Sequence, residues 1–407
     1  MTKVLPYDAF NMCKARAGLM TLHEAVQQFE ENEEYEEKQH GLHKVHAKEI
    51  FNTRNAIWSV TRLAGWKTER VTRLISKFDA VPYNRTLITF QEKLLYVPVV
   101  PGATREYPFT PERLRMHFED VWLTAKDGVK LHAWLLKYTP ATRGPTVLFL
   151  QENAGNIAHR LESSRYTMDR LHCNMLLLSY RGYGASEGKP TEQGLRLDAQ
   201  AALDHLLARD DIDVDRIVVF GRSLGGAVGA DLVHRNPNKV AALVVENTFT
   251  SVLDMAGVVL PVLSNLLSTK GVRPLNGLVR SQWRTIDVIS KIDTPILFLS
   301  GAKDELVPPT HMRQLYAAAQ RNPGGSSLFV EVAAGGHMDT WLRGGQRYWR
   351  VLSLFITHHA GGGVGGGVGD GFGERGGKEE LIEELSEVVR ESAGELTLRR
   401  VGDGAKM

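Results

Sequence analysis

The chain has 407 residues, of which 43% are hydrophobic and 24% charged, and its formal net charge at neutral pH is +2. This composition is ordinary for a soluble globular protein and leaves no strong field that would attract nucleic acid. The two cysteines, Cys13 and Cys173, exclude a disulfide framework and a cysteine-based zinc site. The N-terminus has no signal-peptide pattern, and the longest apolar stretch, 252–267, is too interrupted to span a membrane. We therefore expect a cytoplasmic location from these features.

Residues 1–85 form a charged extension that we expect to be largely helical. A run of glutamates is followed by His40, His43 and His46. These histidines drift around a helix and have no carboxylate partners at i+4, so we interpret the segment as a solvated helix. We expect no metal site in this protein.

The segment 54–78 within this extension is basic and amphipathic. Val71, Leu74, Ile75 and Phe78 share one helical face, with lysine and arginine residues around it. Such a helix either contacts an anionic membrane surface or packs on the main domain, and the sequence leaves both readings open.

Residues 86–359 have the pattern of an α/β domain. The predicted strands are 118–123, 129–138, 146–151, 174–179, 216–220, 241–245, 295–300 and 328–332. The predicted helices are 157–171, 191–208, 224–235, 286–292, 311–320 and 341–357. Short apolar strands that alternate with helices predict a mostly parallel central sheet flanked by helices. The turn at 126–128 predicts an antiparallel hairpin at the start of this sheet.

An insertion at about 249–283 interrupts the alternation. It is rich in leucine, valine and methionine. It forms either a small cap that supplies an apolar acyl pocket or a helix that only fills the core. Both interpretations fit the sequence.

The C-terminal part has two segments. Residues 360–377 are dominated by glycine and predict a flexible linker. Residues 378–407 form an acidic amphipathic tail, in which Leu381 and Leu385 share a face opposite several glutamates. We expect a solvated helix here, and docking of a partner is the alternative.

A G-x-S-x-G motif at 221–225 carries most of the functional information. It follows the predicted strand 216–220 and opens the predicted helix 224–235. Strand, G-x-S-x-G and helix in this order are the nucleophile elbow of an α/β-hydrolase, in which the serine hydroxyl projects from a strained bend. Ser223 is therefore the predicted nucleophile.

A serine hydroxyl needs a base, and the base needs an acid that holds its tautomer. In this fold the chain order is serine, acid, histidine. Asp304 follows a late strand, and His337 lies in a glycine-containing loop before the last helix, so they are the predicted acid and base. Glu305 and Glu246 are alternative acids. We expect Asp339 to hold the loop and not the imidazole.

Two backbone N–H groups must face the oxyanion that forms on attack. We expect one from Leu224, directly after the nucleophile, and one from Asn153, in the loop after strand 146–151. That loop also reads as a plain turn with Asn156 as helix N-cap, and both readings are compatible. Arg222 pairs with Glu246 or Asp304, and the sequence does not decide between them.

The motifs taken together resemble a known family. They lie at 91–98, 151–160, 179–188, 218–229, 246–257 and 337–341. The chain resembles the plant Wavy Growth-type α/β-hydrolases, relatives of alpha/beta hydrolase domain-containing protein 13. The resemblance implies a Ser223, Asp304 and His337 triad and no cofactor. It also implies an acyl ester or lipid-modified protein as substrate, and membrane association.

Three functions are compatible with this sequence. The first is a serine hydrolase of acyl esters or thioesters, of the acyl-protein thioesterase type. The second is a non-catalytic growth-signalling scaffold that keeps the fold as a binding surface. The third is an aminopeptidase or amidase. We expect no nucleic-acid partner, and the sequence names neither the natural acyl chain nor the oligomeric state.

Overall fold

A computed structural model describes residues 91–93, 95–99, 104–138, 144–259, 276–361, 378–392 and 394–399. The chain divides into two compact units: Met1–Leu95 with Ala256–Arg280, and Tyr96–Met255 with Ser281–Met407. The extension 1–85, its segment 54–78, most of the glycine linker and the middle of the insertion (260–275) lie outside the described residues.

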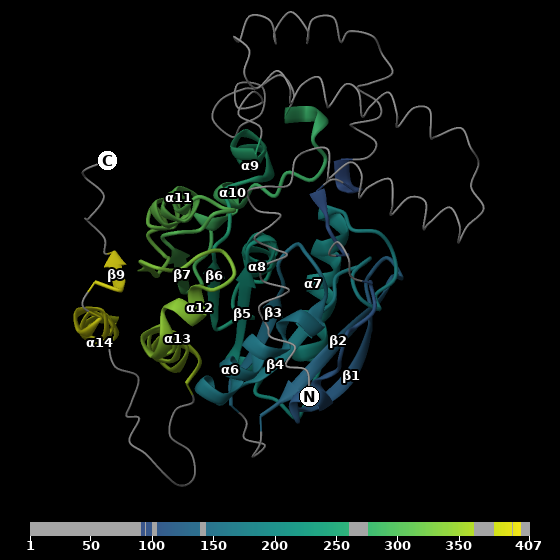
Figure 1. The fold of residues 1–407 in the computed structure, drawn as a ribbon, viewed down its shortest axis with the longest axis horizontal. Coiled ribbons are helices and arrows are strands. Elements are labelled where there is room, and N and C mark those ends of the chain that lie inside the picture. Colours follow the sequence, from purple (N-terminus) through teal and green to yellow (C-terminus); the bar gives the residue numbers. More distant parts are fainter. Residues whose placement is uncertain are drawn as a thin grey trace, which may run out of the picture. The chain divides into compact units, whose positions relative to one another are not determined.

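The larger unit contains a nine-stranded sheet with the order β1-β2-β4-β3-β5-β6-β7-β8-β9. The strands are β1 (His117–Thr124), β2 (Lys130–Lys137), β3 (Thr146–Leu150), β4 (Asn174–Leu178), β5 (Ile217–Arg222), β6 (Ala242–Glu246), β7 (Ile296–Gly301), β8 (Ser327–Val332) and β9 (Leu396–Arg399). The six strands from β4 to β8 in this order are parallel, and antiparallel β1, β2 and β9 complete the edges (Figure 1). The predicted α/β-hydrolase architecture, a mostly parallel sheet with an opening hairpin, is confirmed.

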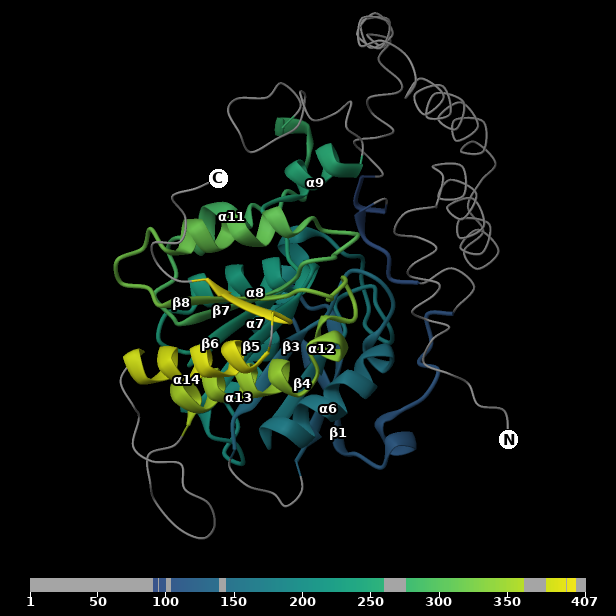
Figure 2. The same ribbon diagram turned by 60° about the vertical axis from the view of Figure 1, so that its left-hand side comes forward.

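Helices cover both faces of this sheet. The α-helices are α6 (Leu161–Leu171), α7 (Glu192–Leu207), α8 (Leu224–Arg235), α9 (Val252–Val259), α10 (Thr285–Ile289), α11 (Pro309–Ala319), α12 (Thr340–Arg343), α13 (Gly345–Ala360) and α14 (Lys378–Glu391). Short 3₁₀ turns are η2 (Pro111–Leu114), η3 (Ile157–Arg160), η4 (Val214–Arg216) and η6 (Asn276–Leu278). Helices α6, α13 and α14 lie on one side of the sheet, and α8 and α11 lie on the other (Figure 2).

Burial explains why these segments form strands. Every residue of β3, β4, β5, β6 and β7 is buried, as expected for strands covered on both faces. The edge strand β1 instead mixes exposed, half-buried and buried positions. The apolar runs in the sequence therefore mark the centre of the sheet.

One predicted helix is divided in the structure. The pattern predicted a single helix over 341–357, but α12 ends at Arg343 and α13 begins at Gly345. The backbone of Gly345 has a φ of 53°, which an α-helix does not accommodate. The left-handed backbone at Gly345 therefore separates the short helix α12 from the last helix, α13.

The acidic C-terminal segment belongs to the domain. Leu381, Leu385 and Val388 of α14 are buried in the hydrophobic core, and α14 packs against α13. Strand β9 then pairs antiparallel with β8, with Val332 opposite Leu396. The expectation of a solvated helix was therefore wrong for its apolar face, because α13 and the sheet edge offer that face an apolar surface. The glutamates of the opposite face remain exposed.

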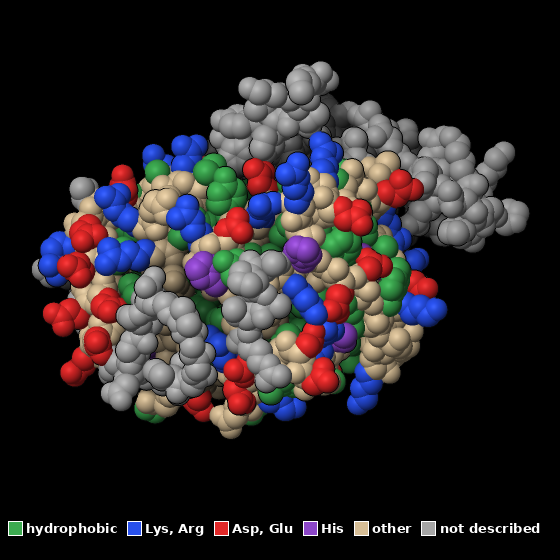
Figure 3. Space-filling view, turned by 90° about the horizontal axis from the view of Figure 1, so that it is seen from below, with side chains coloured by type: hydrophobic (Ala, Val, Ile, Leu, Met, Phe, Trp, Pro, Cys, Tyr) green, Lys and Arg blue, Asp and Glu red, His purple; other side chains and the backbone are tan. Residues whose placement is uncertain are grey.

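Within the part of the chain that the structure describes, no helix is both long and apolar enough to cross a bilayer. Basic and acidic side chains are interspersed on the face seen in Figure 3, in line with the small net charge.

Removing the Leu385 side chain tests the docking of α14. Leu385→Ala should lower the free energy of unfolding by about 3 kcal/mol, because a buried leucine loses its contacts and leaves a cavity. Urea denaturation measures this change. The exposed neighbour Glu384 provides a control, and Glu384→Ala should change the value by less than about 0.5 kcal/mol. Equal stability of the two variants would mean that α14 does not pack on the domain.

Candidate active site

Ser223 occupies a tight bend between β5 and α8. Its φ of 53° and ψ of −120° lie outside the regions that side-chain-bearing residues favour. A Cβ on Gly221 would stand 2.1 Å from the carbonyl oxygen of Gly225, and one on Gly225 would stand 1.9 Å from that of Leu150. Gly221 is thus required by a backbone contact across the bend, and Gly225 by the close approach of the end of β3.

Asp304 and His337 form a buried pair. His337 Nδ1 lies 2.8 Å from Asp304 Oδ2. The other carboxylate oxygen of Asp304 accepts hydrogen bonds from the backbone N–H groups of Leu306, at 2.9 Å, and Val307, at 2.8 Å. These bonds fix the carboxylate, and the carboxylate in turn orients the imidazole so that its Nε2 is available for proton transfer.

The other carboxylates near the histidine loop, Glu305 and Asp339, have other partners. Glu305 accepts a hydrogen bond from the backbone N–H of His337 at 3.2 Å, so it supports the loop and not the ring. Asp339 accepts from the backbone N–H of Gly336 at 2.7 Å and pairs with Arg343 at 2.9 Å, which also holds the loop. Among these carboxylates, Asp304 has the hydrogen bond to the imidazole.

The last residue of β6 and the two residues after it connect the serine bend to the histidine loop. The backbone N–H of Ser223 donates to the carbonyl of Glu246 at 2.9 Å, and the Thr248 hydroxyl donates to the carbonyl of Ser223 at 2.7 Å. Between them, Asn247 Nδ2 donates to the carbonyl of His337 at 3.0 Å and to that of Gly336 at 3.1 Å. Three consecutive residues therefore hold both halves of the candidate site.

Sequence reasoning did not identify Asn247 and Thr248. Asn247 has a φ of 48°, a left-handed conformation in which asparagine is enriched. An asparagine directly after a buried strand was the available signal, but it does not reveal which loop the side chain reaches.

The structure places Ser223, Asp304 and His337 at one edge of the sheet. They follow β5, β7 and β8, which are parallel strands of the same sheet, so their carboxyl ends meet at the same edge. Within the described residues, the Ser223 hydroxyl makes no hydrogen bond to His337, and the two are linked through the β6 end instead. Catalytic hydrogen bonds of this kind often tighten only when substrate binds.

The loop after β3 carries the proposed oxyanion donor. The side-chain oxygen of Asn153 accepts from the Tyr183 hydroxyl at 2.8 Å and from the backbone N–H of Val97 at 3.3 Å. Asn156 caps η3, with its side chain accepting from the backbone N–H of Ala158 at 3.2 Å. Tyr183, from the turn at 181–186, therefore helps to fix this loop. Leu224, the other proposed donor, opens α8 at its positive end.

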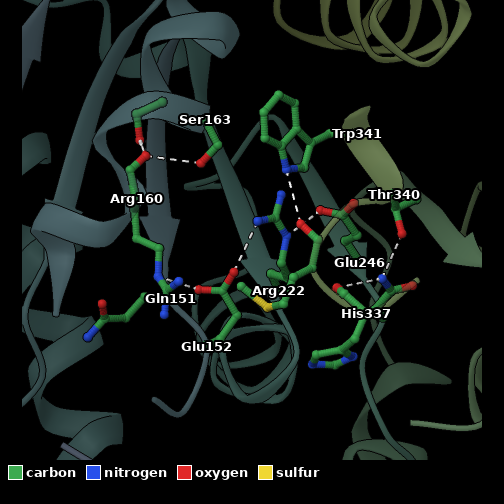
Figure 4. A network of polar contacts seen from close by, with 12 residues as sticks. Gln151, Glu152, Arg160, Ser163, Arg222, Glu246, His337, Thr340 and Trp341 are labelled. Atoms are coloured by element: carbon green, nitrogen blue, oxygen red, sulfur yellow. Dashed lines mark hydrogen bonds and ion pairs between the residues drawn. The ribbon is translucent and has the colours of Figure 1, made fainter. Parts of the chain in front are cut away.

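Arg222, directly before the nucleophile, binds two carboxylates (Figure 4). Its Nε lies 2.6 Å from Glu246 Oε2, and its Nη1 lies 3.0 Å from Glu152 Oε1. The structure thus decides the question that the sequence left open, in favour of Glu246, and adds Glu152 as an unforeseen partner.

The charges around Arg222 are fully buried, which shifts their pKa values. Burial favours a raised pKa for both glutamates, but Arg160 and Arg222 outweigh it at Glu152, whose pKa lies below its usual value. At Glu246 burial prevails and the pKa is raised. Burial acts to lower the pKa of Arg222, but the two carboxylates outweigh it and hold that pKa above its usual value.

Metal ligation has no support in the described ranges, where no three histidine, cysteine, aspartate or glutamate side chains gather in a way that would hold an ion. The histidines at 40, 43 and 46 lie outside these ranges.

The sheet order and the serine bend at the end of β5 define the protein as an α/β-hydrolase. Residues 191–359 match the Prolyl oligopeptidase family. Alpha/beta hydrolase domain-containing protein WAV2 of Arabidopsis thaliana is 60% identical over 67% of this chain and 90% of its own length. Protein bem46 of Schizosaccharomyces pombe is 35% identical over 75% of this chain and 96% of its own. The chain therefore belongs to the α/β-hydrolase family that includes WAV2 and bem46.

A solved structure supports the fold independently. The Pyrococcus furiosus esterase Pf2001 superimposes with a TM-score of 0.51 over 63% of this chain and 98% of its own, at 19% identity. At this identity the similarity concerns the fold alone.

The strain at Ser223 predicts an unusual order of stability. Ser223→Gly should have a free energy of unfolding about 1 kcal/mol higher than Ser223→Ala, because alanine keeps the Cβ that is strained at this φ and glycine does not. Thermal and urea unfolding of both variants measure the difference.

The helical Ser163 provides the control pair. There the order should reverse, with Ser163→Gly about 1 kcal/mol less stable than Ser163→Ala. If alanine is the more stable substitution at both positions, the bend at Ser223 is not strained.

Proposed function

We propose that this protein is a serine hydrolase that cleaves acyl esters or thioesters through an acyl-enzyme intermediate. The observation that carries the proposal is the buried Asp304–His337 pair, tied by Asn247 to the same strand end that holds the Ser223 bend. A fixed acid and imidazole at the same sheet edge as a serine on a strained bend are the parts that nucleophilic acyl transfer requires.

The reaction begins with attack of Ser223 Oγ on the substrate carbonyl carbon. His337 Nε2 takes the hydroxyl proton, while its Nδ1–H donates to Asp304 and stabilises the imidazolium. The resulting oxyanion accepts hydrogen bonds from the backbone N–H groups of Leu224 and Asn153. The C–O or C–S bond then breaks, and His337 gives its proton to the departing alcohol or thiol.

Water completes the cycle. His337 removes a proton from the water as it attacks the acyl-serine carbonyl. The C–O bond to Ser223 then breaks, His337 returns that proton to Ser223 Oγ, and the carboxylic acid is released. Every proton and electron pair in this sequence is supplied by protein side chains, substrate and water. The proposed mechanism therefore uses neither a metal nor a cofactor.

The substrate class is part of the proposal. The hydrolase name of WAV2 supports a hydrolytic reaction, and within that reaction we propose ester-like substrates. A lipidated protein with an S-acyl group is the specific substrate that we propose. It would place the protein at a membrane surface, with the basic segment 54–78 as the proposed contact.

Peptide or amide hydrolysis is the second candidate. The match of residues 191–359 to the Prolyl oligopeptidase family favours it. The same serine, base and oxyanion donors serve amides as well as esters, so substrate selectivity decides between the two.

An activity-based probe tests the nucleophile. A fluorophosphonate should label the wild-type protein, and Ser223→Ala should abolish labelling and lower kcat on an ester by about 10³-fold or more, because the attacking oxygen is gone. Ser300 provides the control: it is buried at the end of β7, and in the described part of the chain its hydroxyl makes no hydrogen bond. Ser300→Ala should keep full labelling. Labelling that persists in Ser223→Ala would contradict the assignment.

A substrate panel tests the class of reaction. We expect hydrolysis of p-nitrophenyl esters and S-acylated peptides with a higher kcat/KM than that of aminoacyl anilides, because the proposed substrate has an alcohol or thiol leaving group. Preference for the anilides would favour the peptidase. A protein that hydrolyses none of them, with full biological rescue by Ser223→Ala, would support the non-catalytic scaffold.

A further inference from the structure

Four charged side chains form a buried cluster beneath the candidate site. They are Glu152, Arg160, Arg222 and Glu246, and each is at most 7% exposed. Arg222 lies between the two carboxylates, at 2.6 Å from Glu246 and 3.0 Å from Glu152 (Figure 4). Glu152 also lies 2.6 Å from Arg160 Nε, and Arg160 Nη2 donates to the carbonyl of Ala154 at 2.5 Å. We call these four residues the buried charge cluster.

The cluster joins three neighbouring strands at the edge where the site lies. Strands β3, β5 and β6 are adjacent and parallel, and Arg222 is in register with Glu246. Glu152 follows β3 by two residues, and Arg160 ends η3, which continues the same loop. The ion pairs therefore link the loop after β3 directly to the ends of β5 and β6.

Three members of the cluster directly precede residues of the site. Glu152 precedes Asn153, a proposed oxyanion donor, and Arg222 precedes the nucleophile Ser223. Glu246 precedes Asn247, which holds the histidine loop. A backbone shift at any of these charged residues would displace the adjacent site residue, which is a proposed oxyanion donor, the nucleophile or the residue that holds the histidine loop.

Stability alone does not account for four buried charges. Removing two arginines and two glutamates from water is costly, and apolar residues of similar volume often stabilise a protein equally well or better. What ion pairs add is directional geometry, since each arginine nitrogen fixes the position of one carboxylate oxygen. The cluster is electrically balanced, with two positive and two negative side chains.

We infer that the buried charge cluster positions the oxyanion donors, by holding the loop that carries Asn153 at a fixed distance from the Ser223 bend. This inference rests on the proposed hydrolase function. The cluster residues are positioning residues, because they act through Asn153, Ser223 and Asn247 and do not touch substrate. Oxyanion stabilisation needs donors within a few tenths of an ångström of their best position, so loss of the cluster should slow acylation.

Glu152 is the best member to change, because it joins both arginines and lies on the loop itself. Glu152→Gln keeps the size of the side chain and removes its charge. With a p-nitrophenyl ester, kcat should fall about tenfold while KM stays within about twofold of the wild type, because oxyanion contacts form mainly in the transition state. The rate of fluorophosphonate labelling should fall in parallel.

Asp231 provides a matched control. It is also a buried carboxylate between two arginines, at 2.8 Å from Arg235 and 3.4 Å from Arg196, but it lies on α8 away from the loop after β3. Asp231→Asn should lower thermal stability less than Glu152→Gln does, because Arg235 and Arg196 are 33% and 40% exposed. It should leave kcat within about twofold of the wild type, as expected for a charge with a structural role only.

Amide hydrogen exchange gives a readout that does not depend on activity. Exchange across residues 152–156 should accelerate at least about tenfold in Glu152→Gln, and it should be unchanged in Asp231→Asn. If Glu152→Gln does not fold, Arg160→Met removes the link to Ala154 and should give the same pattern more weakly.

The outcomes separate the two proposals. A wild-type protein without labelling or hydrolysis would contradict the hydrolase function, and accelerated exchange in Glu152→Gln would still support positioning of the loop. Unchanged exchange, or a kcat in Glu152→Gln no lower than in Asp231→Asn, would overturn the inference. A loss confined to KM would overturn it as well.

Discussion

The candidate site depends on hydrogen bonds made at the end of β6. The serine bend comes from β5, and the histidine loop comes from β8, three strands further along the sheet. Glu246 and Thr248 bind the backbone on either side of Ser223, and Asn247 binds the backbone of His337. Because these three residues are consecutive, a movement of this strand end would displace both the nucleophile Ser223 and the base His337. A parallel sheet makes this possible, since the loops that follow neighbouring strands emerge at one edge.

The site also concentrates unfavourable features that the rest of the domain must offset. Ser223 has a strained backbone, and four charged side chains are buried beneath it. Such features persist only where the surrounding structure determines them strongly. Here the central strands are buried along their whole length, and helices α6, α13 and α14 add a further apolar layer on one face. The docked C-terminal segment thus belongs to the structure that supports the site, although a glycine-rich stretch separates it in the sequence.

The fold and the family constrain the type of reaction more closely than they constrain the identity of the substrate. An α/β-hydrolase with a serine bend and a buried aspartate–histidine pair is suited to acyl transfer, yet the same fold accommodates esters, thioesters and amides. The selectivity among them must come from the groups that surround the leaving group and the acyl chain. We propose that the insertion at about 249–283 supplies some of these groups; residues 260–275 of it are outside the described part of the chain.

The sequence by itself determined the architecture and the positions of the candidate catalytic residues. Apolar runs separated by helical segments predicted the parallel sheet, and the glycines around Ser223 predicted the bend, because both signals are local along the chain. Chain order and strand context also led to Asp304 and His337, which the structure joins by a hydrogen bond. Only the tertiary structure decided the partners of Arg222, the role of Asn247 and the docking of α14. The hydrogen bonds of Arg222 to Glu246 and Glu152, and of Asn247 to His337, join residues that are 24, 70 and 90 positions apart in the chain. No local sequence pattern indicates which distant side chain a buried polar group will contact.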